Sequence, residues 1–260
     1  MSDTIELEWQ GDVAILRLND PASLNAVTIA MLEAFDRLLD DVSARARAMI
    51  LTGAGRGFCS GANIGVGMDS VMESPDYDSG AALDSHINPL MTRLRNMPVP
   101  WISAVRGPAA GVGASLALAA DMIVASDTAY FLQAFPKIGL VPDGGSSHLL
   151  VRTIGRPRAT EMMLLGERLP AATALQWGLI NRLVPDADLE AEAMALATRL
   201  AGSAYSLRLI RQLAWTALDG DWDETLAAER RLQRLAGRTA DHREGVKAFV
   251  AKRPATFTGA

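Results

Sequence analysis

An acidic residue in an apolar, glycine-lined turn is the first feature of this sequence that could do chemistry. Asp143 follows Val141 and Pro142 and precedes two glycines. Apolar surroundings disfavour the charged form of a carboxyl group, which raises its pKa and suits it to accept a proton from a substrate. Asp143 could equally cap the helix expected to begin near Ser146, because Asp is common at helix N-termini. The residues alone leave both interpretations open.

Two glycine-rich segments could supply backbone N–H groups to a ligand. Residues 57–63 follow a short apolar run, and residues 107–115 lie between a strand-like and a helix-like segment. Glycines let the backbone approach a ligand closely, and free N–H groups at a helix start can bind an oxyanion. Tight turns and close helix–strand packing would require the same glycines. Neither segment has the GxGxxG spacing of a dinucleotide site or the GxSxG spacing of a hydrolase elbow.

Length, charge and composition exclude several other classes of protein. The 260 residues suffice for one large domain, and 49% apolar with 21% charged residues is ordinary globular composition. A net charge of −5 argues against nucleic-acid binding. The single cysteine, Cys59, excludes an intrachain disulfide, and the three histidines lack zinc-site spacing, so we expect no metal. No apolar run reaches the ~18–20 residues of a membrane span, and we expect a cytoplasmic protein without a membrane partner.

The periodicity predicts the elements that must position these groups. Residues 5–18 alternate as a β-hairpin around Gly11 and Asp12, and residues 28–42 have helical spacing with Thr28 as N-cap. We expect a surface loop at 68–82 and tryptophans packed in the core, including Trp222. The recurring order indicates an α/β core with right-handed crossovers. The other strands are expected at 48–51, 101–105, 122–125 and 180–184, and the other helices at 85–95, 114–120, 158–165, 171–177, 188–201, 206–218, 223–236 and 241–250.

An ordered set of short motifs runs from Ile5 to Phe257. Together they resemble the enoyl-CoA hydratase/isomerase family, the crotonase superfamily. The motifs are Leu18-Asn19-Asp20-Pro21, Leu24-Asn25-Ala26, Leu51-Thr52-Gly53, Phe58-Cys59-Ser60-Gly61-Ala62-Asn63, Gly107-x-x-x-Gly111-x-Gly113, Leu116-Ala117-Leu118-Ala119-x-Asp121, Gly139-Leu140-x-Pro142, Ala174-x-x-x-Gly178-Leu179-Ile180, Asp241-x-x-Glu244-Gly245-x-x-Ala248-Phe249 and Lys252-Arg253.

The resemblance implies the crotonase fold, an α/β spiral of β-β-α units with a helical C-terminal oligomerisation region. We expect the spiral core with its CoA and catalytic sites at residues 1–190 and the trimerisation region at 191–260. The assembly implied is a homotrimer or a dimer of trimers. The substrate implied is an acyl-CoA thioester, so coenzyme A enters as part of the substrate and no separate cofactor is expected.

The resemblance also assigns roles by position. The backbone N–H groups of Ala62 and Val112 correspond to the oxyanion hole that polarises the thioester carbonyl. Val112 stands where the family usually has glycine, and Asn63 stands where it usually has Asp. Arg56, Lys252 and Arg253 are candidate phosphate contacts, or ordinary surface bases. The remaining expected CoA and substrate contacts are Leu24, Ala26, Ser60, Asn63, Ile64, Gly111, Ser115, Phe135 and Pro142.

Two departures from the family pattern bear on the reaction. Hydratases of the family use two glutamates, whose positions align with Ser115 and Phe135, and these side chains cannot do acid–base work at neutral pH. Asp143 is similar in position to the acid of members that move double bonds, and residues 134–145 look most like the ring-opening isomerase of phenylacetate catabolism. We therefore expect a 1,3-proton shift by Asp143 through a thioester dienolate. The alternatives are a non-catalytic acyl-CoA-binding homologue, or a hydratase that draws a second acid from Asp69, Glu73, Asp76, Asp78 or Asp84.

Overall fold

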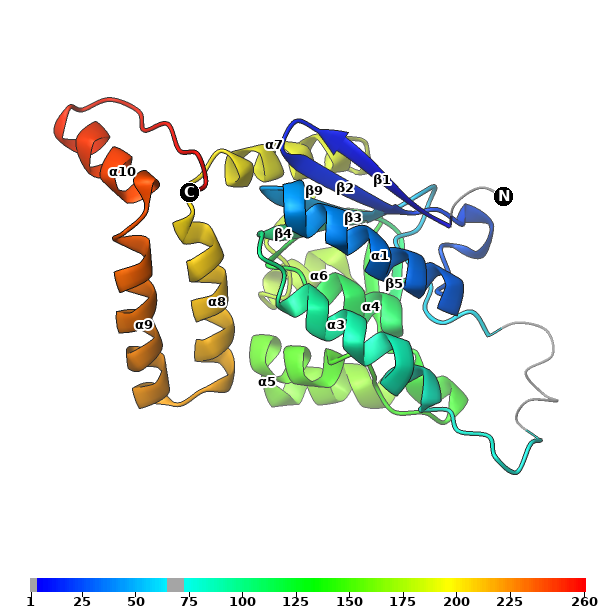
Figure 1. Cartoon of the computed structure of the whole chain (residues 1–260). Coiled ribbons are helices and arrows are strands. Elements are labelled where there is room, and N and C mark those ends of the chain that lie inside the picture. Colours follow the sequence, from blue (N-terminus) through cyan, green and yellow to red (C-terminus); the bar gives the residue numbers. More distant parts are fainter. Residues whose placement is uncertain (1–3, 65–72) are drawn as a thin grey trace.

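A six-stranded sheet lies at the centre of the molecule, in the order β1-β2-β3-β4-β6-β9 (Figure 1). The computed structural model describes residues 4–64 and 73–260. The first two strands form the expected antiparallel hairpin, in which Gln10 pairs with Val13 across the turn, and every later pair is parallel. The strands are β1 (Ile5–Gln10), β2 (Val13–Leu18), β3 (Ala48–Gly53), β4 (Trp101–Val105), β6 (Met122–Ser126) and β9 (Arg182–Val184).

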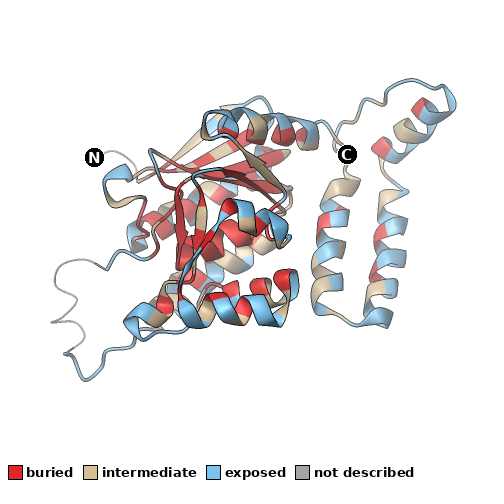
Figure 2. Ribbon diagram, turned by 180° about the vertical axis from the view of Figure 1, so that it is seen from behind, coloured by how far each residue is buried: buried red, intermediate tan, exposed pale blue. Residues whose placement is uncertain are grey.

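Both faces of this sheet are covered, which explains why its central strands are apolar throughout (Figure 2). Side chains alternate along a strand, so Met49 and Leu51 pack on one face and Ala48 and Ile50 on the other. The N-cap predicted for the first helix is confirmed, because the Thr28 hydroxyl accepts a hydrogen bond from the Met31 N–H. The helices that build these two layers are α1 (Ile29–Arg45), α3 (Asn88–Arg95), α4 (Val112–Leu118), α5 (Ser146–Leu165), α6 (Ala171–Gln176) and α7 (Leu189–Ala201).

A second, three-stranded sheet escaped the sequence analysis. Its strands, β5 (Pro108–Ala110), β7 (Tyr130–Leu132) and β8 (Arg168–Pro170), have three residues each, too few to show an alternating pattern. The isolated bridge between Cys59 and Ala109 joins residues 57–63 to β5. Short helical turns complete the chain at Pro21–Ser23, Leu83–Ile87, Phe135–Ile138 and Asp186–Asp188.

The C-terminal helices divide between the core and an arm. The expected boundary at residue 190 falls inside α7, which packs on the sheet through Leu189 and Leu196. The antiparallel pair α8 (Ser206–Asp219) and α9 (Trp222–Ala236) projects from the core, and α10 (Ala240–Val250) follows at the end of the pair where α8 begins (Figure 1). The expected core position of Trp222 is wrong, because its side chain is 74% exposed on this arm. No helix in the described part of the chain is long and apolar enough to cross a membrane.

Candidate active site

The turn that carries Asp143 lies between a short helical turn and α5. Three hydrogen bonds converge on the Asp143 carbonyl oxygen, from the Ser115 hydroxyl at 2.8 Å, the Ser146 hydroxyl at 3.0 Å and the Ser146 N–H at 3.1 Å. The next residue, Gly144, has a φ of +57°, a conformation that glycine adopts without strain. The backbone of the turn is therefore held by one hydrogen bond from α4 and two from the start of α5.

The Asp143 side chain is free for chemistry, since it does not cap α5. The N-cap of α5 is Gly145, and no side chain accepts a hydrogen bond there. The Asp143 Oδ1 atom is buried and has no hydrogen-bond partner among the described residues. Burial raises the pKa of this carboxyl to about 6, because a partly desolvated carboxylate is disfavoured relative to its protonated form. A carboxyl in this state is suited to exchange protons near neutral pH.

The first expected oxyanion donor, Ala62, lies in a bridge that directs its N–H away from the neighbouring strand. Val27 donates to the Gly61 carbonyl at 2.7 Å, and Asn63 donates to the Val27 carbonyl at 2.9 Å. In a parallel pairing of this kind, the residue between the two bonds turns its own N–H to the opposite side. Among the described residues, the Ala62 N–H has no backbone acceptor. It is available to a ligand.

The second expected donor, Val112, is the first residue of α4. A residue in that position has no acceptor within its own helix, so its N–H remains available. The bridge between Cys59 and Ala109 sets the segment leading to Ala62 beside the segment leading to Val112. A β-carbon on Gly61 would lie 3.0 Å from the Ala110 carbonyl oxygen, which shows how closely the two backbones run.

Residues 57–63 and 107–115 meet beside the Asp143 turn, and we call this meeting point the junction. The two residues in the hydratase-glutamate positions lie there too. Ser115 is fully buried on α4, three residues after Val112, and its hydroxyl is engaged with the Asp143 turn. Phe135 is buried too, and a β-carbon on Gly111 would contact its ring at 3.8 Å. Neither side chain can ionise at neutral pH. The junction thus combines two available N–H groups with one half-buried carboxyl.

A family model described as enoyl-CoA hydratase/isomerase matches residues 8–260. The chain belongs to the enoyl-CoA hydratase/isomerase family. It is 43% identical to a 1,2-epoxyphenylacetyl-CoA isomerase of Escherichia coli, over 95% of both chains, and 40% identical to a probable enoyl-CoA hydratase of Rhodobacter capsulatus, over 98% of both. Its structure matches an enoyl-CoA hydratase subunit from Geobacillus kaustophilus with a TM-score of 0.91 and 33% identity, covering 99% of this chain and 98% of the other. The crotonase fold expected from the motifs is confirmed.

In this enoyl-CoA hydratase/isomerase family member, a hydrogen bond joins two of the segments that carry the expected CoA contacts. The Ser60 N–H donates to the Leu24 carbonyl at 3.0 Å, which joins the segment around Ala26 to residues 57–63. Asn63 and Ile64 are exposed just beyond Ala62, and Pro142 directly precedes Asp143. Arg56 is exposed in the same loop.

Asn25 lies in one of these segments, and the sequence analysis missed its role. It is fully buried, has a φ of +58°, and donates its side-chain amide to the carbonyl oxygens of Ala54, Gly57 and Phe58 at 2.8–3.2 Å. Its own Oδ1 accepts from the Asp20 N–H at 2.9 Å. An Asn between a turn and a helix cap often bonds to backbone groups, so its position is a partial signal of this role. The carbonyls that Asn25 clamps together lie about 30 residues away along the chain, and sequence spacing cannot reveal them.

The C-terminal bases are not brought to these segments within one chain. Lys252 and Arg253 directly follow α10, which lies at the opposite end of the molecule from β5 (Figure 1). Arg253 pairs with Glu244 in a bidentate contact at 2.6 and 2.9 Å. This contact lowers the pKa of Glu244 to about 2. Arg253 thus has a structural partner of its own.

The remaining candidates for catalysis are exposed or inert. The acids of the 68–84 segment that the structure describes, Glu73, Asp76, Asp78 and Asp84, are all exposed, and Asp69 lies outside the described residues. Burial raises the pKa of the Cys59 thiol to about 12, which keeps it protonated. Among the described residues, no group of three or more His, Cys, Asp or Glu side chains is placed to hold a metal ion.

Proposed function

We propose that this protein isomerises an unsaturated acyl-CoA by a 1,3-proton shift, with Asp143 as the only acid–base group. The observation that carries the proposal is the Asp143 carboxyl, with its buried Oδ1 unpaired among the described residues and its pKa raised to about 6. A single carboxyl suffices for this reaction, because the proton it removes from one carbon is the one it returns to another. Hydration would require further acid–base groups.

Each part of the junction has one task in this mechanism. The thioester carbonyl accepts hydrogen bonds from the Ala62 and Val112 N–H groups. Asp143 removes a proton from the α- or γ-carbon, and the electron pair of that C–H bond passes through the conjugated system to the carbonyl oxygen. The dienolate is held by the two N–H groups, and Asp143 returns its proton to the other end of the allylic system. Loss of one such donor costs about 2.7–4 kcal/mol of transition-state stabilisation.

The substrate is positioned by the groups around these atoms. We place the CoA portion along Leu24, Ala26, Ser60, Asn63 and Ile64, and the acyl portion against Gly111, Phe135 and Pro142. The expected substrate contact of Ser115 is not kept, because its side chain is fully buried and its hydroxyl is bonded to the Asp143 carbonyl. Coenzyme A is part of the substrate, so the proposed reaction needs no further cofactor. The identity to the Escherichia coli 1,2-epoxyphenylacetyl-CoA isomerase makes a ring-derived acyl group, and with it a role in phenylacetate catabolism, the substrate class to test beside straight-chain enoyl esters.

A proton-exchange assay in D2O tests the proposal. The protein is incubated with a 3-enoyl-CoA, a 2-enoyl-CoA and 1,2-epoxyphenylacetyl-CoA, and products are read by mass. We expect double-bond migration or ring isomerisation with no addition of water, and deuterium incorporation in those turnovers in which the carboxyl exchanges its proton with the solvent before returning it. Asp143→Asn should abolish turnover while the dissociation constant for the CoA ester stays within about twofold. The matched control is Asp84→Asn, which alters an exposed acid of the same region and should retain full activity.

Two other outcomes would replace the proposal. A mass gain of one water on the 2-enoyl ester would make the protein a hydratase with acids still to be identified. Tight binding of CoA esters without turnover or exchange on any of them would make it an acyl-CoA-binding homologue. Undiminished activity of Asp143→Asn would remove Asp143 from the mechanism.

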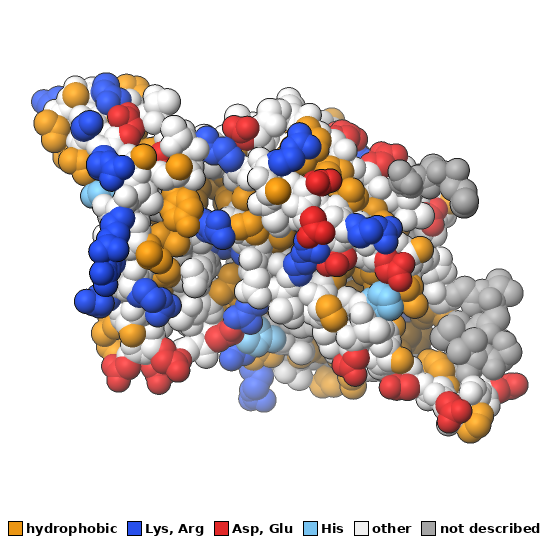
Figure 3. All heavy atoms as spheres, viewed as in Figure 1, with side chains coloured by type: hydrophobic (Ala, Val, Ile, Leu, Met, Phe, Trp, Pro, Cys, Tyr) orange, Lys and Arg blue, Asp and Glu red, His pale blue; other side chains and the backbone are white. Residues whose placement is uncertain are grey.

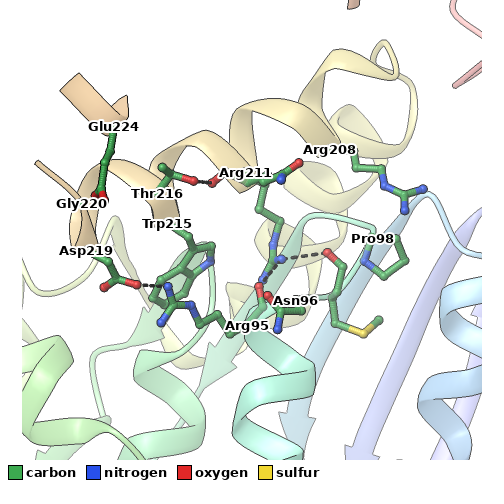
Figure 4. A pocket seen from close by; sticks show the side chains of 12 residues that line it. Arg95, Asn96, Pro98, Arg208, Arg211, Trp215, Thr216, Asp219, Gly220 and Glu224 are labelled. Atoms are coloured by element: carbon green, nitrogen blue, oxygen red, sulfur yellow. Dashed lines mark hydrogen bonds and ion pairs between the residues drawn. The ribbon is translucent and has the colours of Figure 1, made fainter. Parts of the chain in front are cut away.

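We also propose that the arm of α8, α9 and α10 packs on other copies of the chain, in a homotrimer or a dimer of trimers. The arm exposes large apolar side chains, among them Trp222 and the 85% exposed Phe249. Figure 3 shows the molecule hollowed between the arm and the core, with hydrophobic side chains in the hollow. A cavity of about 500 Å³ lies there, and Figure 4 shows Arg95 reaching across it, paired with Asp219 and stacked on Trp215.

Sedimentation equilibrium tests this assembly. We expect the mass of three or six chains for the wild-type protein. Phe249→Asp should release smaller species, because it places a charge on a surface that the assembly would bury. Arg243→Asp changes the charge of a neighbouring exposed position and serves as the comparison. A monomer at all concentrations would remove the proposal for the arm and leave that for Asp143 untouched.

A further inference from the structure

The hydroxyl of Ser115 links α4, which begins with the proposed oxyanion donor Val112, to the turn that carries Asp143. Ser115 lies on α4, the helix that begins with the Val112 N–H, and donates to the Asp143 carbonyl at 2.8 Å. We propose that Ser115 is a positioning residue, which fixes the Asp143 carboxyl relative to the oxyanion hole. The inference rests on the proposed function, since it assigns Ser115 a part in the same reaction.

The other donors to this carbonyl cannot do the same. Both the hydroxyl and the N–H that complete the set belong to Ser146, which lies in the first turn of α5 just after the loop. They would move with the loop if it shifted. Ser115 is the one donor of the three that comes from α4. The Ser115 hydrogen bond therefore fixes the distance between the Asp143 loop and α4, the helix whose first N–H is the proposed oxyanion donor.

Ser115 also sets the distance between the Asp143 loop and α4 by its size, because Gly144 packs directly against it. A β-carbon at Gly144 would lie 2.8 Å from the Ser115 β-carbon and 3.1 Å from its hydroxyl oxygen, so the loop backbone rests directly on this side chain. Ser115 is fully buried, which leaves no solvent to fill a gap. A larger residue at 115, such as the glutamate of the hydratases, would displace the loop and the carboxyl with it. Serine is thus both the right size and the right donor for a base at 143.

The geometry predicts a kinetic effect without loss of the fold. Ser115→Ala keeps the spacing and leaves the Asp143 carbonyl with two donors, so the chain should still fold. One net hydrogen bond corresponds to about a tenfold change, and a misplaced catalytic group can cost more. We expect kcat to fall about tenfold or more while KM stays within about twofold, since no atom that binds CoA is removed.

The test compares Ser115→Ala with Ser126→Ala. Ser126 is also fully buried. It is the last residue of β6, and its hydroxyl contacts the Thr128 hydroxyl at 2.7 Å and neither Asp143 nor Ser115. Both variants should lose similar stability in urea, and only Ser115→Ala should lose kcat. Equal kcat in Ser115→Ala and wild type, or equal losses in the two variants, would overturn the positioning role.

A second readout does not depend on turnover. The pKa of the Asp143 carboxyl, followed by carbon-13 NMR of labelled Asp, should drop toward the ordinary value in Ser115→Ala, because a released loop lets water reach the carboxyl. It should be unchanged in Ser126→Ala. An unchanged pKa in Ser115→Ala would also overturn the proposal. If wild type exchanges no proton on any ester, the isomerase function fails, yet this titration still decides whether Ser115 holds the carboxyl.

Discussion

Gly113 lies so close to Cys59 that a β-carbon on it would fall 2.5 Å from the Cys59 carbonyl oxygen and 2.7 Å from its sulfur. The pair joins the second residue of α4 to the segment that leads into Ala62. The two proposed oxyanion donors lie close to this contact along the chain. Ala62 is three residues after Cys59, and Val112 is one residue before Gly113. The spacing between the donors therefore depends on the missing side chain at 113.

Gly113→Ala should open the oxyanion hole while the chain still folds. The added methyl group meets backbone, which cannot swing aside, so one segment must shift and one donor is displaced. We expect kcat to fall about 100-fold, in line with the loss of a single donor. The control is Gly245→Ala in α10, where the new β-carbon would lie 3.5 Å from the Phe257 ring, an ordinary contact, and activity should be retained. Full activity in Gly113→Ala would show that the donors are set by other contacts.

The rate of isomerisation should depend on pH through Asp143. The base acts in its ionised form, and burial raises its pKa to about 6. We expect kcat/KM to rise about tenfold per pH unit below this value and to level off above it. A profile measured on the free enzyme with a non-ionising acyl group checks the midpoint. A midpoint near the ordinary value for Asp, about 3.9, would mean that the carboxyl is solvated in solution.

The same pKa predicts that Asp143 lowers the stability of the fold at neutral pH. Between the ordinary pKa and the raised one, the unfolded chain binds fewer protons than the native chain, so the free energy of unfolding falls as pH rises through this window. Asp143→Asn removes this penalty. Allowing for the partial solvation of the side chain, we expect the variant to be about 1–2 kcal/mol more stable than wild type above the raised pKa and equal to it below the ordinary one. Urea unfolding at both pH values checks the sign.

The elements that the sequence predicted are those with strong local signals. Alternation, capping and apolar runs predicted the hairpin at 5–18, the helix capped by Thr28 and the buried strand at 48–51, which extends to Gly53 in the structure. A helix start near Ser146 was expected and is confirmed, but the periodicity predicted a helix over 158–165 alone, because Gly155, with a φ of +78°, and Pro157 break α5 and hide its first half. The second sheet was missed because its strands are too short to alternate.

The site was predictable in its parts and less so in its assembly. The glycine-rich segments and the lone acid could be found as unusual local compositions, and the family motifs supplied their roles. What spacing could not show is that Ser115 and Gly144 pack together, or that Asn25 reaches three carbonyls near Gly57. Contacts of this kind join residues far apart in the chain and depend on the completed fold.

Asn25→Asp should destabilise the loop that precedes the oxyanion segment. Aspartate tolerates the same positive φ, so the backbone is unaffected, but it cannot donate to the carbonyls of Ala54, Gly57 and Phe58. We expect the free energy of unfolding to fall by about 3 kcal/mol and CoA-ester binding to weaken. Urea unfolding measures the change in the free energy of unfolding, and titration calorimetry measures the change in CoA-ester affinity. Asn96→Asp, at an exposed position, should change the stability by less than about 1 kcal/mol, and an equally small effect at Asn25 would contradict the clamp.

Arg211 attaches the C-terminal arm to the core through a buried ion pair. Its side chain is 7% exposed and donates to Asp121 at 2.7 Å and to the carbonyl oxygens of Leu94, Arg95 and Met97, where α3 ends. Burial raises the pKa of Asp121, and the charge of Arg211 opposes that rise. Arg211→Met keeps the length of the side chain but removes the positive charge beside Asp121 and the guanidinium donors to three carbonyls. Among the described residues, Asp121 then keeps only the neutral Trp101 N–H as a donor, so we expect a loss of about 3–5 kcal/mol in urea unfolding. Arg93→Met breaks an exposed pair with Asp36 and Asp40 and should cost about 1 kcal/mol or less, and similar losses in both variants would show that the arm is held elsewhere.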